Sequence, residues 1–288
     1  MQRHHYVPQF YLREWYVSGK SAFWLYCRDD DGRLIFGHKS ARSVGYQSGL
    51  YSVIPEIFGI QTSVSNEFEE KFFSPLDSAA SRVSRKLIKS GLPSLSTEDR
   101  LVWSLFVNSL LERSPTRINE VKEDAKIIAE KCVYELKERF GMSETDQRCF
   151  WEMLDIPAIT NNAVLTGMVK WICDNETIRH FFDMAWVVIR LPEGKNHFLT
   201  GDTPVVVNGD NSGTPIHVLS LALSPSALLV MHTRDEEFDE DFIKKMALLH
   251  SPLIAKQTKR YLISSRELLD DGNVKYRRIL SEIFTGSK

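Results

Sequence analysis

The hydrophobic pattern changes period twice along the chain, and this change limits the folds that the sequence can adopt. Residues 66–183 carry apolar side chains every three or four positions, the period of amphipathic helices. The parts on either side, residues 1–60 and 184–288, carry short apolar runs broken by Gly, Pro, Asn and Ser, as strands do. The pattern predicts an α+β fold with a central helical bundle, in which strands from the N-terminal and C-terminal parts form a mainly antiparallel sheet.

Individual elements follow from local signals. Residues 21–40 are expected to form two strands around a turn at Asp30-Asp31-Gly32, and residues 49–53 a further short strand. A long helix is expected from Asn66 to near Gly91, with a kink at Pro75. Ser96 and Asp99 resemble a capping box at the start of an almost wholly apolar helix that Pro115 stops. That helix, residues 101–113, is predicted to be the most buried.

The remaining elements complete the expected fold. They are a charged helix over roughly 116–140, helical stretches around 144–154 and 158–183, β-like runs at 184–191, 197–207, 215–224 and 227–233, a helix near 239–257 and a last strand at 260–265. Neither an internal repeat nor a linker-like stretch interrupts this series. The chain is therefore predicted to form a single domain, residues 1–288.

Composition and charge narrow the class of protein. With 288 residues, of which 43% are hydrophobic, the chain can bury a sizeable core. The formal net charge is -2, and acidic and basic residues alternate, so no overall basic field indicates a nucleic-acid-binding protein. Apolar runs end well short of the roughly 20 residues that span a bilayer. The four cysteines show no metal-binding spacing and are predicted to be reduced, so we expect a cytoplasmic protein without a membrane partner.

The opening segment, MQRHHYVPQFYLREW, is unusually rich in histidine and aromatic residues for a chain end. Pro8 favours extended backbone before it, and successive side chains of an extended segment point to opposite faces. His4 and His5 are therefore not expected to reach the same metal ion: one would serve a site while the other packs. The alternative is that the aromatic residues fix the segment to the core and both histidines only form hydrogen bonds at its edge.

Two further stretches contain candidate catalytic or binding residues. In HFLTGDTPVVV, Asp202 follows an apolar strand, where a carboxylate can serve as a metal ligand or a base. The same sequence also makes a good β-turn, in which the aspartate accepts backbone hydrogen bonds. Arg113 and Arg117 flank the end of the buried helix, where a cation is favourable with the helix dipole or can bind an anion.

The chain resembles a bacterial family called domain of unknown function 4238. The resemblance rests on HHYVPQFYLR at residues 4–13, LLERSP at 110–115 and FLTGDTPV at 198–205. The last motif departs from the family pattern, which has Ser where this chain has Gly201 and Asn where it has Thr203. The resemblance implies that the conserved motifs belong to one site, made of His4, His5, Arg13, Arg113 and Asp202. It implies no activity.

Two functional hypotheses follow, and the sequence leaves open whether the protein is an enzyme. The first is a metal-assisted hydrolase, a nuclease or phosphodiesterase acting on a nucleic acid or a nucleotide. In it, Asp202 and His4 hold Mg²⁺ or Mn²⁺, and His4, His5 and Asp202 are catalytic. Arg13 and Arg113 bind the substrate. No Walker A motif, dinucleotide glycine fingerprint, nucleophile elbow or zinc-protease motif is present in the sequence.

The second hypothesis is a non-catalytic protein-binding module, in which the same residues fix the N-terminus to the core. Geometry separates the two hypotheses. Polar groups that converge on an open cavity favour the enzyme, and mutually saturated hydrogen bonds favour the module. In either case, a ring nitrogen of His4 or His5 is expected to lie beside the Asp202 carboxylate or to share one metal ion or water with it.

Overall fold

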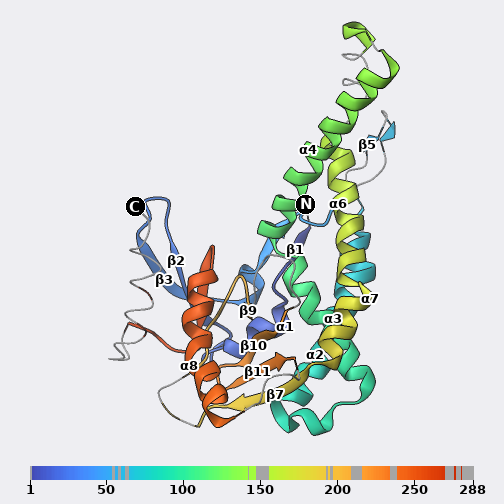
Figure 1. Ribbon diagram of the computed structural model, residues 1–288. Coiled ribbons are helices and arrows are strands. Elements are labelled where there is room, and N and C mark those ends of the chain that lie inside the picture. Colours follow the sequence, from blue (N-terminus) through green and yellow to red (C-terminus); the bar gives the residue numbers. More distant parts are fainter. Residues whose placement is uncertain are drawn as a thin grey trace.

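The computed structural model describes residues 2–53, 56–57, 60–61, 65–141, 143–146, 156–192, 194, 197–208, 216–233, 239–269, 276 and 280. Within them, antiparallel sheets are flanked by helices from the middle of the chain, an α+β architecture (Figure 1). The prediction of this fold class is confirmed.

One four-stranded sheet joins the two ends of the chain. Its order is β3 (Leu34–Lys39), β2 (Phe23–Arg28), β12 (Tyr261–Ser264) and β8 (Thr200–Gly201), with antiparallel pairs throughout. The expected hairpin forms the first two strands. Because β12 pairs with β2 on one side and β8 on the other, segments far apart in sequence share one sheet.

The second four-stranded sheet comes from the C-terminal part. Its order is β7 (Ala185–Arg190), β11 (Ala227–His232), β10 (Val218–Ser224) and β9 (Val205–Asn208), again antiparallel. Every residue of β10 and β11 is buried, as expected for strands covered on both faces. Helix α8 (Glu240–Gln257) follows, and the Asp239 side chain caps it by accepting a hydrogen bond from the Phe242 N–H.

The helices of the middle part are η3 (Phe68–Phe73, a π-helical turn), α2 (Ser74–Ser90), η4 (Leu92–Ser94), α3 (Thr97–Glu112), α4 (Pro115–Phe140), α6 (Ile156–Ile172) and α7 (Asn175–Asp183). The predicted capping box of Ser96 and Asp99 starts α3. Helix α4 extends away from the rest of the molecule as an arm (Figure 1). None of the helices in the described part is long and apolar enough to span a bilayer.

Short elements complete the structure. They are β1 (Arg3–His5), α1 (Gln9–Leu12), η1 (Arg13–Trp15), η2 (Ala41–Ser43), β4 (Tyr46–Ser48), β5 (Glu56–Ile57) and β6 (Ile60–Gln61). Strand β1 pairs antiparallel with β4, so the predicted extended backbone before Pro8 is confirmed.

The structure corrects two of the predicted elements. The strand expected at residues 49–53 lies earlier, as β4, because Gly49 has a φ of 68° and turns the chain. The stretch 158–183 is not one helix but two, because the Asp174 side chain caps the start of α7. Of the helix expected at 144–154, residues 147–154 lie outside the described residues.

The helix expected from Asn66 to Gly91 is present as η3 and α2. Phe73 and Ala80 are fully buried, whereas Phe72 and Ala79 are only partly buried. The π-helical turn at Phe68–Phe73 lies directly before α2 and holds one more residue than an α-helical turn. Pro75 lacks an N–H and cannot continue regular α-helical hydrogen bonding through that turn.

Helix α3 is central, although one end of it reaches solvent. Trp103, Phe106 and Val107 are fully buried, whereas Leu101 is 49% exposed. The helix predicted at residues 101–113 is therefore buried over its body, whereas Leu101 at its start reaches solvent. Cys27, Cys132 and Cys173 are free, in line with the prediction, and Cys149 lies outside the described residues.

Candidate functional site

Aromatic side chains fix the N-terminal segment to the C-terminal sheet elements. The Tyr6 and Tyr261 hydroxyls lie 2.9 Å apart, and the Tyr11 hydroxyl lies 2.8 Å from Thr200 Oγ1. The indole N–H of Trp15 donates to the Phe198 carbonyl over 3.2 Å. The segment therefore docks beside residue 202, as expected, but through tyrosine and tryptophan.

His4 is buried behind β1, with a partner on each ring nitrogen. Its Nδ1 accepts the Tyr51 backbone N–H over 2.8 Å, and its Nε2 lies 3.1 Å from Asn66 Oδ1. The ring also stacks on Tyr51, with centroids 5.4 Å apart. Burial lowers the pKa of His4, although the bond to Asn66 opposes this effect. These contacts leave neither nitrogen for a metal ion and suit a structural role.

Asp202 is likewise engaged by its neighbours. It is 6% exposed, and its carboxylate accepts the backbone N–H groups of Lys259 and Arg260 over 3.1 and 2.8 Å. Burial raises the pKa of Asp202, and these backbone bonds oppose the rise. Neither a hydrogen bond nor an ion pair joins Asp202 to His4 or His5, all of which are described residues. The expected contact between the histidines and Asp202 is therefore not formed.

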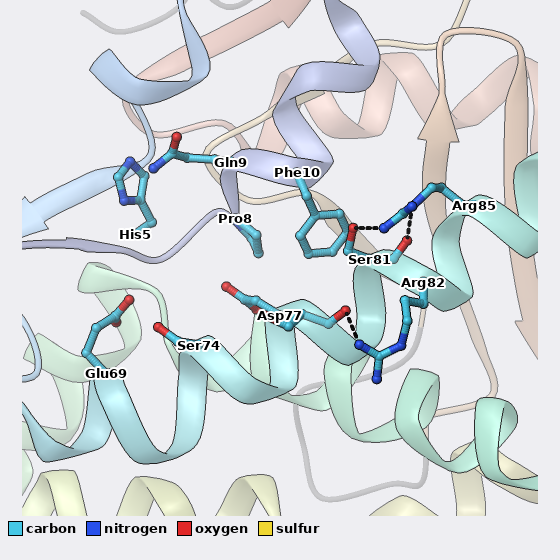
Figure 2. Close-up of a pocket in the computed structure, with 11 residues that line it drawn as sticks. His5, Pro8, Gln9, Phe10, Glu69, Ser74, Asp77, Ser81, Arg82 and Arg85 are labelled. Atoms are coloured by element: carbon cyan, nitrogen blue, oxygen red, sulfur yellow. Dashed lines mark hydrogen bonds between the residues drawn. The ribbon is translucent and has the colours of Figure 1, made fainter.

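His5 lies on the other side of β1, as the alternation of strand side chains predicts, and lines an open cleft of about 510 Å³. The cleft lies between the start of α1 and the helical segment η3–α2 (Figure 2). Its lining residues are His5, Pro8, Gln9, Phe10, Glu69, Ser74, Asp77, Ser78, Ser81, Arg82 and Arg85. His5 and Glu69 lie toward one end, and Arg82 and Arg85 toward the other (Figure 2).

The His5 ring is held neutral. Its Nε2 is buried without a hydrogen-bond partner, so the backbone hydrogen bond that it makes with Arg42 uses Nδ1. Burial lowers the pKa of His5 to about 4, helped by the charges of Arg3, Arg113 and Arg13. With the proton on Nδ1, Nε2 carries an unused lone pair and is chemically a base.

Glu69 has the opposite shift. Its Oε2 is buried without a partner, and burial together with the Asp77 charge raises the pKa of Glu69 to about 7. Arg113 and a hydrogen bond with Ser74 oppose that rise. Glu69 can therefore act as a proton donor at or below neutral pH. It projects from the π-helical turn, a local distortion that is frequent at functional sites.

Arg113 lies fully buried behind the cleft and contacts its wall through Asp77. Its Nη1 lies 3.0 Å from Asp77 Oδ1, and its guanidinium packs 5.5 Å from the ring of Phe73 and 5.6 Å from that of Phe106. Its Nε and Nη2 are buried without partners. Burial raises the pKa of Asp77, and the pairing with Arg113 counteracts this rise.

Other arginines lie at the margins of the cleft. Arg13 Nη2 donates to the side-chain oxygen of Gln9 over 3.2 Å, which places it beside the cleft. Arg82 donates to the Ser78 carbonyl, and Arg85 donates to the carbonyl and the hydroxyl of Ser81, so both side chains lie against α2. These cations make one side of the cleft attractive to anions.

The site inferred from the sequence is thus divided in the structure. His5, Arg13 and Arg113 lie in or around one cleft, whereas His4 and Asp202 are held elsewhere by saturated hydrogen bonds. Sequence reasoning missed Glu69 and Asp77. Their signal was weak: two carboxylates about two turns apart on a helix that Pro75 interrupts.

No metal site is evident in the part of the chain that the structure describes. Its His, Cys, Asp and Glu side chains nowhere gather in groups of three or more that could hold an ion. The cleft offers two carboxylates, Glu69 and Asp77, at its wall. Together with substrate oxygens and water, two carboxylates are a usual ligand set for Mg²⁺.

Fold and cleft define an α+β protein with an open polar cleft between its N-terminal segment and a central helix. The chain belongs to the family described as "Protein of unknown function (DUF4238)", whose model matches residues 3–266. Searches of curated proteins and of solved structures gave no match. The family resemblance inferred from the motifs is confirmed.

Proposed function

We propose that the protein is a hydrolase of phosphodiesters, such as nucleic acids or nucleotides, and that the His5–Glu69 cleft is its active site. The observation that carries the proposal is that His5 and Glu69 line the same cleft and that one polar atom of each, His5 Nε2 and Glu69 Oε2, is buried without a partner. Such orphaned polar atoms cost about 1–3 kcal/mol each and call for a functional explanation.

The two side chains have complementary proton chemistry. His5 Nε2 would take a proton from a water molecule that attacks phosphorus, and the Glu69 carboxylic acid would give a proton to the leaving oxygen. With pKa values of about 4 for His5 and about 7 for Glu69, both groups are in the required form between these two values. The arginines around the cleft would neutralise the substrate phosphate.

A divalent cation on the cleft carboxylates is the alternative to acid catalysis by Glu69. Mg²⁺ or Mn²⁺ would bind Glu69 and Asp77 and complete its ligand set with phosphate oxygens and water. Ion binding needs the ionised Glu69, whereas acid catalysis needs the protonated form. Activity measured with EDTA and with added metal therefore assigns the role of Glu69: metal-dependent turnover makes it a ligand, and metal-independent turnover makes it the acid.

The experiment compares matched variants on defined substrates. Hydrolysis of bis(p-nitrophenyl) phosphate and of labelled single- and double-stranded DNA and RNA is measured for the parent, H5Q and E69Q. E70Q and H38Q are the controls, because both side chains are exposed and lie outside the cleft. We expect the cleft variants to lose activity by at least about tenfold and the controls to keep it. Equal activity in E69Q and E70Q would reject the proposed site.

A second candidate function is the non-catalytic protein-binding module. It is favoured by the saturated hydrogen bonds of His4 and Asp202. Those of His4 tie the N-terminal segment to Tyr51 and Asn66, and those of Asp202 tie its turn to the backbone before β12. In that case none of the substrates above is turned over, and H5Q and E69Q differ from the parent only in stability.

A further inference from the structure

A second hollow, of about 430 Å³, lies beside β4 and is lined on one side by the start of β12. It is separate from the His5 cleft: the two share none of their described lining residues. Its lining residues are Tyr6, Leu25, Lys39, Ser43, Val44, Gly45, Tyr46, Gln47, Ser48, Arg260 and Tyr261. Among these, the charged side chains are Lys39 and Arg260, and both are cations.

The buried wall of this hollow is a pair of tyrosine hydroxyls. Tyr6 and Tyr261 are 3% and 9% exposed, and their hydroxyl oxygens lie 2.9 Å apart. Either hydroxyl can be the donor of this bond, and the hydroxyl that accepts it keeps its own proton for an acceptor in the hollow. A hydrogen bond with Arg260 lowers the pKa of Tyr6, whereas burial raises it.

The surrounding charges favour an anion. The Arg3 guanidinium lies 4.6 Å from the centroid of the Tyr46 ring and adds a third cation near the wall. The opposing charge is Asp202, which raises the pKa of both tyrosines but is outside the lining and already accepts two backbone N–H groups. Cations therefore outnumber the carboxylate around this hollow.

The backbone at Gly45 gives the hollow its shape. Gly45 has a φ of 71°, and a Cβ at this position would lie 3.0 Å from the Val7 carbonyl oxygen and 3.1 Å from Leu12 Cδ1. The Val7 N–H donates to the Gly45 carbonyl over 3.1 Å. Only glycine allows the residue before β4 to approach the N-terminal segment this closely, so this part of the wall depends on glycine at position 45.

We propose that this hollow binds the phosphate group of a small molecule, with Arg260 and Lys39 as the counter-charges and one hydroxyl of the Tyr6–Tyr261 pair as a hydrogen-bond donor. A phosphate carries close to two negative charges at neutral pH and offers three acceptor oxygens, which matches two cations and one hydroxyl donor. The volume exceeds that of a phosphate alone, so a phosphate ester fits as well as the free ion. This binding is independent of the proposed hydrolysis.

Calorimetric titration of the full chain with inorganic phosphate, a nucleoside monophosphate and acetate tests the proposal. The variants are R260A, K39A and Y6F. R82A reports on binding in the other cleft, and R179A serves as the control because Arg179 is exposed and lies outside both linings. We expect saturable phosphate binding that weakens by at least about tenfold in R260A and by about threefold or more in Y6F. R179A should bind as the parent does. Thermal melts establish that each variant is folded.

The outcomes separate the sources of the phosphate and the alternatives to it. Tighter binding of the monophosphate assigns the hollow to a phosphate ester, and equal binding assigns it to the free ion. Acetate that binds as tightly as phosphate overturns the assignment to phosphate. Binding that R82A weakens and R260A leaves unchanged, or the absence of binding by every probe, overturns the proposed site.

Discussion

Arg113, at the C-terminal end of α3, forms a 3.0 Å ion pair with Asp77 in the wall of the His5 cleft. The pair links the most central helix to the helix that carries both cleft carboxylates. Arg113 is fully buried. Burial raises the pKa of Asp77 and the pairing with Arg113 opposes this rise, so loss of the arginine would leave the Asp77 carboxylate without its stabilising charge.

Arg113→Met is therefore expected to destabilise the protein strongly. Removing one partner of a buried pair costs about 3–5 kcal/mol, because the remaining charge is uncompensated. Urea denaturation measures the free energy of unfolding. Arg117→Met is the matched control: Arg117 is 47% exposed and pairs with Glu112 at 3.3 Å, a kind of pair worth about 0–1 kcal/mol. Equal destabilisation by both variants would contradict the role given to Arg113.

Asp202→Ala is expected to lower stability without touching the proposed chemistry. The substitution leaves the backbone N–H groups of Lys259 and Arg260 without their acceptor, at a cost of roughly 1–3 kcal/mol. Asp30→Ala, in the exposed hairpin turn, should change the unfolding free energy by no more than about 0.5 kcal/mol. If the Asp202 variant kept the stability of the parent but lost all phosphodiesterase activity, Asp202 would belong to the active site.

The Tyr11–Thr200 hydrogen bond is expected to contribute to the docking of the N-terminal segment. Tyr11→Phe leaves the buried Thr200 hydroxyl without this partner, and we expect a loss of about 1–2 kcal/mol. Thr200→Val should cost a similar amount, and the double variant should cost less than the sum of the two. A double-mutant cycle by chemical denaturation measures this coupling. Strict additivity would show that the hydroxyls do not interact.

Glu69 is expected to make stability depend on pH. Its pKa rises from 4.5 to about 7 on folding, so the folded state binds more protons than the unfolded state between these values. The contribution of Glu69 to the free energy of unfolding is therefore fully present below about pH 4.5 and is lost as pH rises through about 7. E69Q removes that loss. The free energy of unfolding of E69Q minus that of the parent should therefore grow from about pH 5 to about pH 8.

The pH dependence of stability in E69Q is compared with that of the parent because His5 changes stability with pH in the opposite direction. Its pKa falls from 6.5 to about 4 on folding, so stability at this site is lost as pH falls through that range. The His5 contribution is common to both proteins and cancels in the difference. E70Q, which changes the neighbouring exposed carboxylate, should follow the parent at every pH. An E69Q difference that is constant with pH would contradict the raised pKa.

Much of the fold could be predicted from the sequence because its signals are local. The Asp30-Asp31-Gly32 turn, the capping box of Ser96 and Asp99, and the period change near Asn66 each act over a few residues. The split at Asp174 was missed because an aspartate inside an apolar helical pattern looks like an ordinary polar position. The strand expected at 49–53 failed because apolar content alone does not reveal the turn at Gly49.

The site was harder to predict, because it depends on contacts between distant elements. The sequence indicated that His4 and His5 would face opposite ways, but not which of them would be saturated by Tyr51 and Asn66. It placed Asp202 correctly beside the docked N-terminus, yet the carboxylate is used by backbone N–H groups 57 and 58 residues away. The pKa of Glu69 is raised only through burial and the nearby Asp77, neither of which a local pattern can show.

The pH dependence of phosphodiester hydrolysis, compared among the parent, E69Q and E70Q, tests most directly whether the His5–Glu69 cleft is an active site. With His5 as the base and Glu69 as the acid, the account predicts a bell-shaped profile with limbs at about 4 and about 7. E69Q should lose roughly 100-fold in rate, as for removal of a general acid, and E70Q should match the parent. A profile without a limb near the Glu69 pKa, identical rates in E69Q and E70Q, or no turnover of any phosphodiester would contradict it.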